Sequence, residues 1–227
     1  MKNKLKIIAL LLMNFAFSQN VVLNKVIKTG TNTDKFLYRI NPDSVKSEYL
    51  GEIEVQGFSE DDTAVFDLIY KKAKSIGANA FSFNPFDSID GIPTDLNPSH
   101  YLLSLYEVKK DDFPDNFNKL YLISSSSKLQ KISLNNSVIG LPSRSFVLKK
   151  LSPGKICTIS TRNFLGSSVK VILDKYENGQ YFRFSAFKVN SNSYGKAGIN
   201  IKSGDILKVE KSYGDFLTTI YKGIDLQ

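Results

Sequence analysis

Two side chains of the sequence carry the chemistry most often used in thiol catalysis and in zinc sites: Cys157, the single cysteine, and His100, the single histidine. Cys157 lies in the strand-like run GKICTIS, which predicts a small buried hydrophobic residue with no basic neighbour to activate its thiol. A single histidine leaves no second imidazole for a histidine-based metal site. A dyad of Cys157 and His100 stays open as an alternative, because sequence alone does not fix their distance.

Carboxylates form two further candidate groups. Glu52 and Glu54 alternate with apolar residues in a strand-like run, so both face solvent from one side of that strand. Asp87, Asp90 and Asp95 lie in a loop rich in proline and aspartate, but their spacing lacks the alternate carboxylates and final glutamate of an EF-hand. We therefore predict no catalytic residue, no metal ion and no cofactor, and leave calcium binding by loop 87–95 open.

The run QYFRFSAF supplies the candidate binding residues. Strand alternation places Tyr181, Arg183 and Phe187 on one face, where aromatic and arginine side chains could contact a protein or a glycan. The alternative is that one face of this strand lies in the core and the other in a second interface inside the same domain.

The first 18 residues have the pattern of a secretory signal peptide. Lysines at positions 2, 4 and 6 precede an apolar run that is too short to cross a bilayer, and small residues precede Gln19. Cleavage there would remove three lysines and lower the formal charge from +8 to +5. We expect an exported protein, periplasmic, associated with the outer membrane or secreted, that has no integral membrane span after cleavage. Its scattered lysines do not form a nucleic-acid footprint.

The region 19–108 mixes strands with one helix. Strand-like runs at 36–40, 48–58, 78–83 and 101–108 surround a helical pattern at 59–76, where Ser59 or Asp61 is the expected cap. Gly77 follows the last helical turn, and a glycine there accommodates the left-handed conformation that lets the next strand begin at once. The region therefore predicts a small α+β domain of order β-β-α-β-β.

The segments YLGEIEVQGF and AKSIGANAF resemble the strand, helix and "LGANAV" signature of YbjQ-like small α+β domains, and the shape is similar to the carboxy-terminal domain of RcsF-type envelope stress sensors. The most specific element is Gly77 to Ala80. The resemblance implies a fold only, because this segment has no cysteine or histidine ligand and lacks the disulfides of RcsF-type proteins.

The polar segment 109–118 is expected to be a linker, and 119–227 reads as a β-sandwich-like domain. Short strand-like runs, the last of them FLTTIYKG, alternate with turn sequences such as NNS and SPG. The part from NNSVIGL to GQYFRF resembles a domain-of-unknown-function family of bacterial secreted and lipid-anchored proteins, through Val138 to Leu141, Phe146, Leu151 to Lys155 and Gly179 to Arg183. That resemblance implies a fold and no activity.

The sequence thus predicts a non-enzymatic envelope protein: an adaptor, sensor or accessory subunit that binds an envelope protein partner through exposed strand edges or the domain junction. The alternative is a carbohydrate- or lipid-binding module that uses the aromatic face of the β-domain. An enzyme that uses paired carboxylates ranks third.

Overall fold

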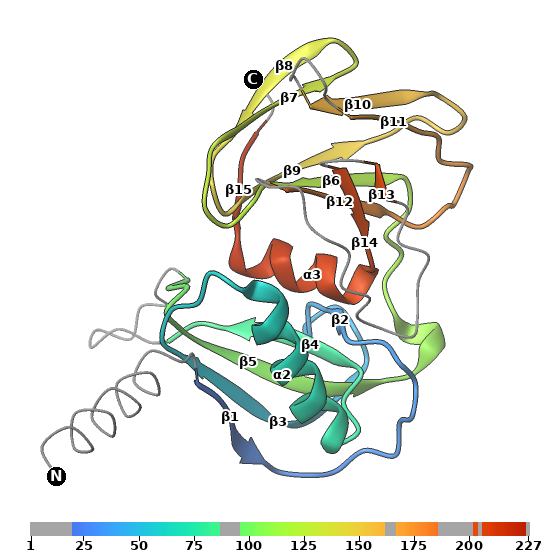
Figure 1. Ribbon diagram of the computed structural model, residues 1–227. Coiled ribbons are helices and arrows are strands. Elements are labelled where there is room, and N and C mark those ends of the chain that lie inside the picture. Colours follow the sequence, from blue (N-terminus) through green and yellow to red (C-terminus); the bar gives the residue numbers. More distant parts are fainter. Residues whose placement is uncertain (1–19, 87–95, 162–166, 186–201, 204–205, 226–227) are drawn as a thin grey trace, which may run out of the picture. The chain divides into compact units, whose positions relative to one another are not determined.

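The computed structural model describes residues 20–86, 96–161, 167–185, 202–203 and 206–225 (Figure 1). In these residues the chain is mostly β-strand, with two α-helices and three sheets, which is an α+β composition. It divides into two compact units, and the boundary along the chain lies between Phe113 and Pro114. The expected signal peptide, the aspartates of loop 87–95 and Phe187 lie outside the described residues.

Unit 1 contains one five-stranded sheet of order β1-β3-β5-β4-β2. Its elements are β1 (Asn20–Val26), β2 (Tyr38–Arg39), β3 (Ser47–Gln56), α2 (Asp62–Ser75), β4 (Ala80–Asn84), β5 (His100–Val108) and the short 3-10 helix η1 (Lys110–Asp112). The chain order is therefore β-β-β-α-β-β. The predicted order lacked β1, an edge strand whose sequence NVVLNKV has no sustained apolar alternation.

Helix α2 forms as its sequence predicts. The Asp61 side chain caps it by accepting hydrogen bonds from the N–H groups of Thr63 and Ala64, both at 3.1 Å. The apolar stripe of the helix is buried, and α2 packs on β1 and β3. The Ala78 N–H bonds the Ala73 carbonyl at 3.0 Å across Gly77, which has a φ of 78°. This Schellman geometry confirms the predicted role of Gly77.

Asn79, the residue directly before β4, is fully buried and connects three segments of unit 1. Its side-chain carbonyl accepts the Val108 N–H and its amide donates to the Val108 carbonyl, both at 2.8 Å. The same amide group donates to Asp34 Oδ2 at 2.9 Å, and Asp34 also binds Lys74 of α2 at 3.2 Å. Buried polar groups satisfied in this way fix the position of the chain around them.

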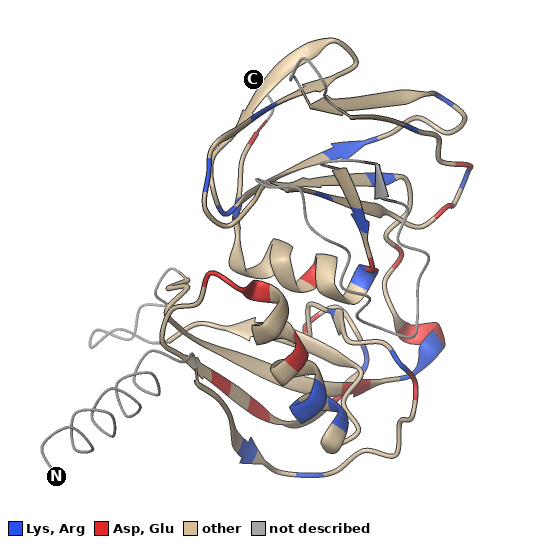
Figure 2. Ribbon diagram, in the orientation of Figure 1, with Lys and Arg blue, Asp and Glu red and all other residues tan. Residues whose placement is uncertain are grey.

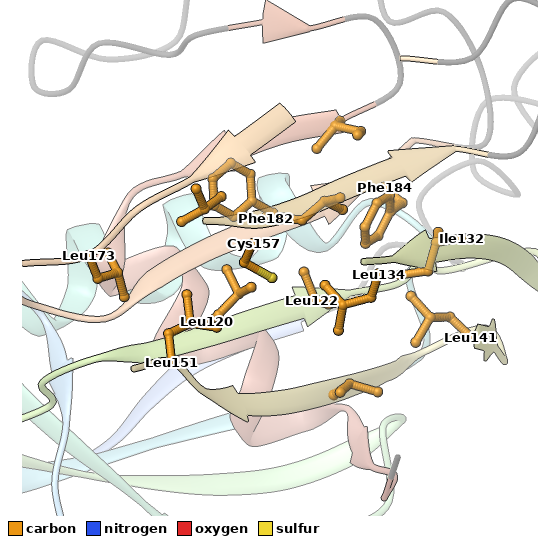
Figure 3. Packing of buried hydrophobic residues seen from close by; sticks show 14 residues of the cluster. Leu120, Leu122, Ile132, Leu134, Leu141, Leu151, Cys157, Leu173, Phe182 and Phe184 are labelled. Atoms are coloured by element: carbon orange, nitrogen blue, oxygen red, sulfur yellow. The ribbon is translucent and has the colours of Figure 1, made fainter. Parts of the chain in front are cut away.

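Unit 2 contains a four-stranded sheet of order β11-β10-β7-β8 and a six-stranded sheet of order β13-β14-β12-β6-β9-β15. The strands are β6 (Lys119–Ile123), β7 (Gln130–Leu134), β8 (Ser137–Leu141), β9 (Ser145–Lys150), β10 (Cys157–Thr161), β11 (Ser168–Val171), β12 (Gln180–Phe184), β13 (Lys202–Ser203), β14 (Ile206–Val209) and β15 (Lys222–Gly223). Both sheets contribute to one hydrophobic core, in which Leu122 and Phe184 meet Ile132 and Leu134 (Figure 3).

Helix α3 (Lys211–Ile220) packs on the other face of the six-stranded sheet, against β12, β6 and β15 (Figure 1). The prediction of a strand at FLTTIYKG was wrong, since most of that segment is the second half of α3. The run of Thr218, Thr219 and Ile220 favours a strand locally, but the Glu210 side chain caps the helix by accepting the Ser212 N–H at 2.7 Å. Packing outweighs the local preference.

The range 109–118, predicted as a linker, contains the boundary between the two units. The first half of this range is ordered and packs on unit 1. Helix η1 occupies 110–112, and Phe113 packs on the cluster around Ile40 and Ala80 and meets the Tyr38 ring edge-on at 5.4 Å.

Candidate functional site

The candidate binding residues of β12 do not form an exposed aromatic face. Tyr181 is 1% exposed and lies under α3, where its ring contacts the backbone of Gly214. Arg183 is half-buried and donates to the Tyr213 hydroxyl at 3.0 Å. Phe182 and Phe184 point the other way, into the core. Tyr181 and Arg183 therefore belong to an interface inside unit 2, which is the alternative considered for this strand.

Tyr181 belongs to a buried polar cluster. Its hydroxyl donates to Asp215 Oδ1 at 2.5 Å and accepts from the Asn116 amide at 3.0 Å. Lys211 binds Asp215 Oδ2 at 2.6 Å, and the Tyr121 ring stacks on the Tyr181 ring with centroids 4.3 Å apart. Every one of these groups has a partner, so the cluster anchors α3 to the sheet.

A cavity of about 320 Å³ lies beside this cluster, between the start of β12 and the end of β14, and Tyr181 and Lys211 are among its lining residues. Its two carboxylates are already used. Glu177 accepts bonds from the Asp174 N–H and the Gln180 amide, and Glu210 is the cap of α3. The cavity therefore presents no free acid for proton transfer.

The carboxylates of β3 have partners too. Glu54 Oε1 accepts hydrogen bonds from the Gln56 amide and from His100 Nε2, both at 2.7 Å, and these bonds lower the pKa of Glu54. Glu52 accepts from the Asn84 amide at 2.9 Å. A carboxylate with a lowered pKa is a weaker proton acceptor, so the geometry favours a structural role for Glu54.

Cys157 lies in the core of unit 2, 2% exposed, and burial raises the pKa of its thiol (Figure 3). The prediction of a small buried hydrophobic residue is confirmed. A thiol in this position is protonated and shielded, which is the opposite of what a nucleophile requires. Among the described residues, no three histidine, cysteine, aspartate or glutamate side chains lie close enough together to hold a metal ion.

The edge strands of the sheets are a second kind of candidate binding site. An edge strand has unpaired backbone N–H and C=O groups that another strand can bond. Five of the six edge strands in the described sheets contain a lysine or an arginine: β1, β2, β11, β13 and β15. Such charges are a common protection against edge pairing. Strand β8, of sequence SVIGL, has none and is tan along its whole length in Figure 2. Its pairing with β7 is also free of bulges.

The turn before β8 fixes which of its backbone groups face outward. Asn135 and Asn136 form a two-residue loop, and both have positive φ, as a type I′ turn requires. Such a loop is closed by a hydrogen-bonded pair, here Leu134 with Ser137, and the bonded pairs then recur at every second residue. The N–H and C=O groups of Val138 and Gly140 consequently point away from β7.

The side chains of β8 divide in the same way. Ile139 and Leu141 pack on the core, whereas Val138 is 47% exposed and Gly140 is exposed with open space above it. Within the described part of the chain, no hydrogen bond occupies the outward N–H and C=O groups of Val138 and Gly140. We take this outward side of Ser137–Leu141, called the β8 edge, as the candidate site. The sequence signal that points to it is a charge-free strand directly after Asn-Asn.

Comparisons with family models, curated proteins and solved structures find no match to this chain. Separately, none of the helices among the described residues has the length and apolar character needed to cross a membrane.

Proposed function

We propose that this protein acts by binding, without catalysis of its own, and that it captures an extended segment of another protein as an added strand at the β8 edge. The observation that carries the proposal is the contrast among the edge strands. Of the six edge strands in the described sheets, β8 alone contains no lysine or arginine. It also pairs with β7 without a bulge, and the backbone groups of Val138 and Gly140 face outward. Strand addition uses main-chain hydrogen bonds for affinity and alternate side chains for specificity.

A partner strand would complete what β8 leaves open. It would bond the N–H and C=O groups of Val138 and Gly140 and extend the four-stranded sheet by one strand. Each net hydrogen bond contributes about 0.5–1.5 kcal/mol, so a short strand binds weakly unless its side chains also pack. Val138 and the partly buried Ile139 supply one apolar contact on each face.

The place of action belongs to the proposal as well. The pattern of residues 1–18 supports export, and we propose an envelope adaptor, sensor or accessory subunit whose second unit is a β-sandwich-like domain extended by α3. Carbohydrate or lipid binding through the aromatic face of β12 is less well supported, since Tyr181 is buried under α3. Intact-mass measurement of the exported protein tests the leader: a mature chain that starts near Gln19 is expected.

The experiment for strand addition compares two matched substitutions. Val138→Lys places a guarding charge on the β8 edge, and Val26→Lys places the same charge at an equally exposed valine of β1, since both valines are 47% exposed. The tagged full chain is used to recover partners from the native envelope. We expect the wild type and Val26→Lys to recover the same protein and Val138→Lys to lose it.

Hydrogen exchange then locates the contact. The amides of Val138 and Gly140 should exchange rapidly in the free protein and slowly in the complex. Equal recovery by Val138→Lys, or a complex in which these amides stay unprotected, would overturn strand addition at this edge. A concentration-dependent dimer that Val138→Lys abolishes would assign the edge to a second copy of the chain instead.

A further inference from the structure

We propose that the β8 edge selects a strand with an acidic side chain facing Gly140, held by Lys131, and with apolar side chains at the next two positions. The inference rests on the proposed strand addition and adds the chemistry of the partner. It follows from which residues line the two faces of β7 and β8 beside the open edge.

Lys131 and Gly140 are directly opposite one another in the β7–β8 pairing. The bonded pairs of this hairpin are Leu134 with Ser137 and every second pair from there, so Lys131 and Gly140 form a non-hydrogen-bonded pair, about 4.5 Å apart at Cα. An added antiparallel strand would meet Gly140 in a hydrogen-bonded pair, at about 5.5 Å. Lys131 and the partner residue would then be about 10 Å apart at Cα, with Gly140 between them.

Gly140 makes this separation useful. It has no side chain, and a Cβ built on it meets no atom within 4 Å, so the space over it is open. The long side chains of Lys131 and of a glutamate opposite Gly140 can meet across that space. Any larger residue at position 140 would fill the gap and separate the two charges.

Lys131 is available for such a contact. It is exposed, and its side-chain ammonium has no ion pair or hydrogen bond with any described residue. It also belongs to β7, which is an inner strand, so it does not block the edge itself. An exposed cation beside a charge-free edge favours an anionic partner and disfavours a cationic one.

The other two partner positions follow from the alternation of the strand. A residue facing Ile139 points to the inner side, where Ile139 packs on the core, and an apolar side chain there would extend that core. A residue facing Val138 lies on the outer side beside Ser133 and Val138, where a β-branched side chain fits an apolar neighbour. For an antiparallel strand the motif reads acidic, apolar, β-branched.

The test uses two synthetic peptides, capped at both ends, that differ in one residue: Ser-Thr-Glu-Val-Val-Thr-Ser and the same peptide with lysine in place of glutamate. Binding to the full chain is measured by fluorescence anisotropy at low and at high salt. We expect the wild type to bind the glutamate peptide about three- to tenfold more tightly, with a preference that shrinks at high salt. Lys131→Glu should reverse the preference.

Lys170→Glu is the matched control, because Lys170 is an exposed lysine on the same outer face but at the far edge, in β11. It should leave the preference for the glutamate peptide unchanged. Equal binding of both peptides, with the Val138 and Gly140 amides protected from exchange, would overturn the acidic selection and leave strand addition standing. Failure of the wild type to bind either peptide would overturn the motif, while strand addition would still be decided by recovery of the native partner.

Discussion

Helices α2 and α3 both cover one face of a sheet, but they are held there by different chemistry. Helix α2 buries an apolar stripe, including Val65 and Ile69, and the glycine that its geometry requires, Gly77, lies just beyond its end. Helix α3 has such a glycine in its interior: Gly214 lies against the Tyr181 ring, next to the Tyr181–Asp215 hydrogen bond. The apolar stripe of a helix can be predicted from the spacing of residues within one segment, whereas a polar contact between two distant segments cannot.

The largest effect that separates the two helices is expected from Gly77→Ala. The alanine would have to adopt a φ of 78°, which costs about 1–3 kcal/mol, and its Cβ would clash with the backbone of Gly30. We expect a loss of about 3 kcal/mol in the free energy of unfolding of unit 1, measured by denaturant titration. Gly154→Ala is the control, because it has a φ of 73° and open space above it. If both variants lose the same free energy of unfolding, the clash with Gly30 contributes nothing beyond the cost of the positive φ.

A smaller effect is expected from Gly214→Ala. Alanine stabilises an exposed helix interior by about 1 kcal/mol relative to glycine, but here its Cβ would overlap the Tyr181 ring. Overpacking of this kind costs about 1–3 kcal/mol, so the sign should reverse. The labelling rate of Cys157, which is buried in the core of unit 2, measures the opening of that unit. Faster labelling is expected in Gly214→Ala; an unchanged or slower rate would mean that α3 moves aside without cost.

The smallest effect concerns the acid side of the pH profile of unit 1. Burial alone would raise the pKa of Asp34, but hydrogen bonds from Asn79, the Phe36 N–H and Lys74 outweigh it and lower that pKa. The ionised carboxylate therefore stabilises the fold above the unfolded pKa of about 3.9, and this stabilisation is lost as the pH falls through the folded pKa.

Asp34→Asn should accordingly destabilise unit 1 by about 1 kcal/mol at pH 7 and by less at pH 3. Thermal unfolding of the variant and the wild type at both pH values measures the difference. Asp67→Asn, at an exposed partner of Lys71 on α2, is the control and should change little at either pH. A deficit of Asp34→Asn that stays constant between pH 7 and pH 3 would contradict the assignment.

The elements that sequence predicted correctly are those whose signals are local. Helix α2 has a capping aspartate, an apolar stripe and a terminal glycine, and the strands β3, β4 and β5 lie at the predicted runs, with bounds that differ by one or two residues. Strand β1 was missed because four of its seven residues are exposed at the edge of the sheet and its apolar residues do not alternate with polar ones. Helix α3 was predicted as a strand because the β-branched run ending at Ile220 outweighs its cap when read alone.

The candidate site could be anticipated only in part. The run Val138–Leu141 belongs to the part of the chain that resembles a family of small β-domains, and the sequence NNS, which begins at Asn135, was expected to be a turn. The edge position of β8 could not be predicted, because it depends on the order of all the strands in the sheet. The burial of Tyr181 has the same origin, since the helix that covers it comes from a distant segment.

The pairing of strands in unit 2 has a consequence for the order in which the chain folds. Strand β6 pairs in parallel with β12, joining Leu120 to Gln180, and β9 pairs in parallel with β15, joining Ser145 to Lys222. Pairings between such distant residues must close long loops first and are slow, whereas the β7–β8 hairpin closes through two residues. During refolding the β7–β8 hairpin should therefore form before the six-stranded sheet. The backbone groups of the β8 edge are then accessible to other chains from the first stages of folding.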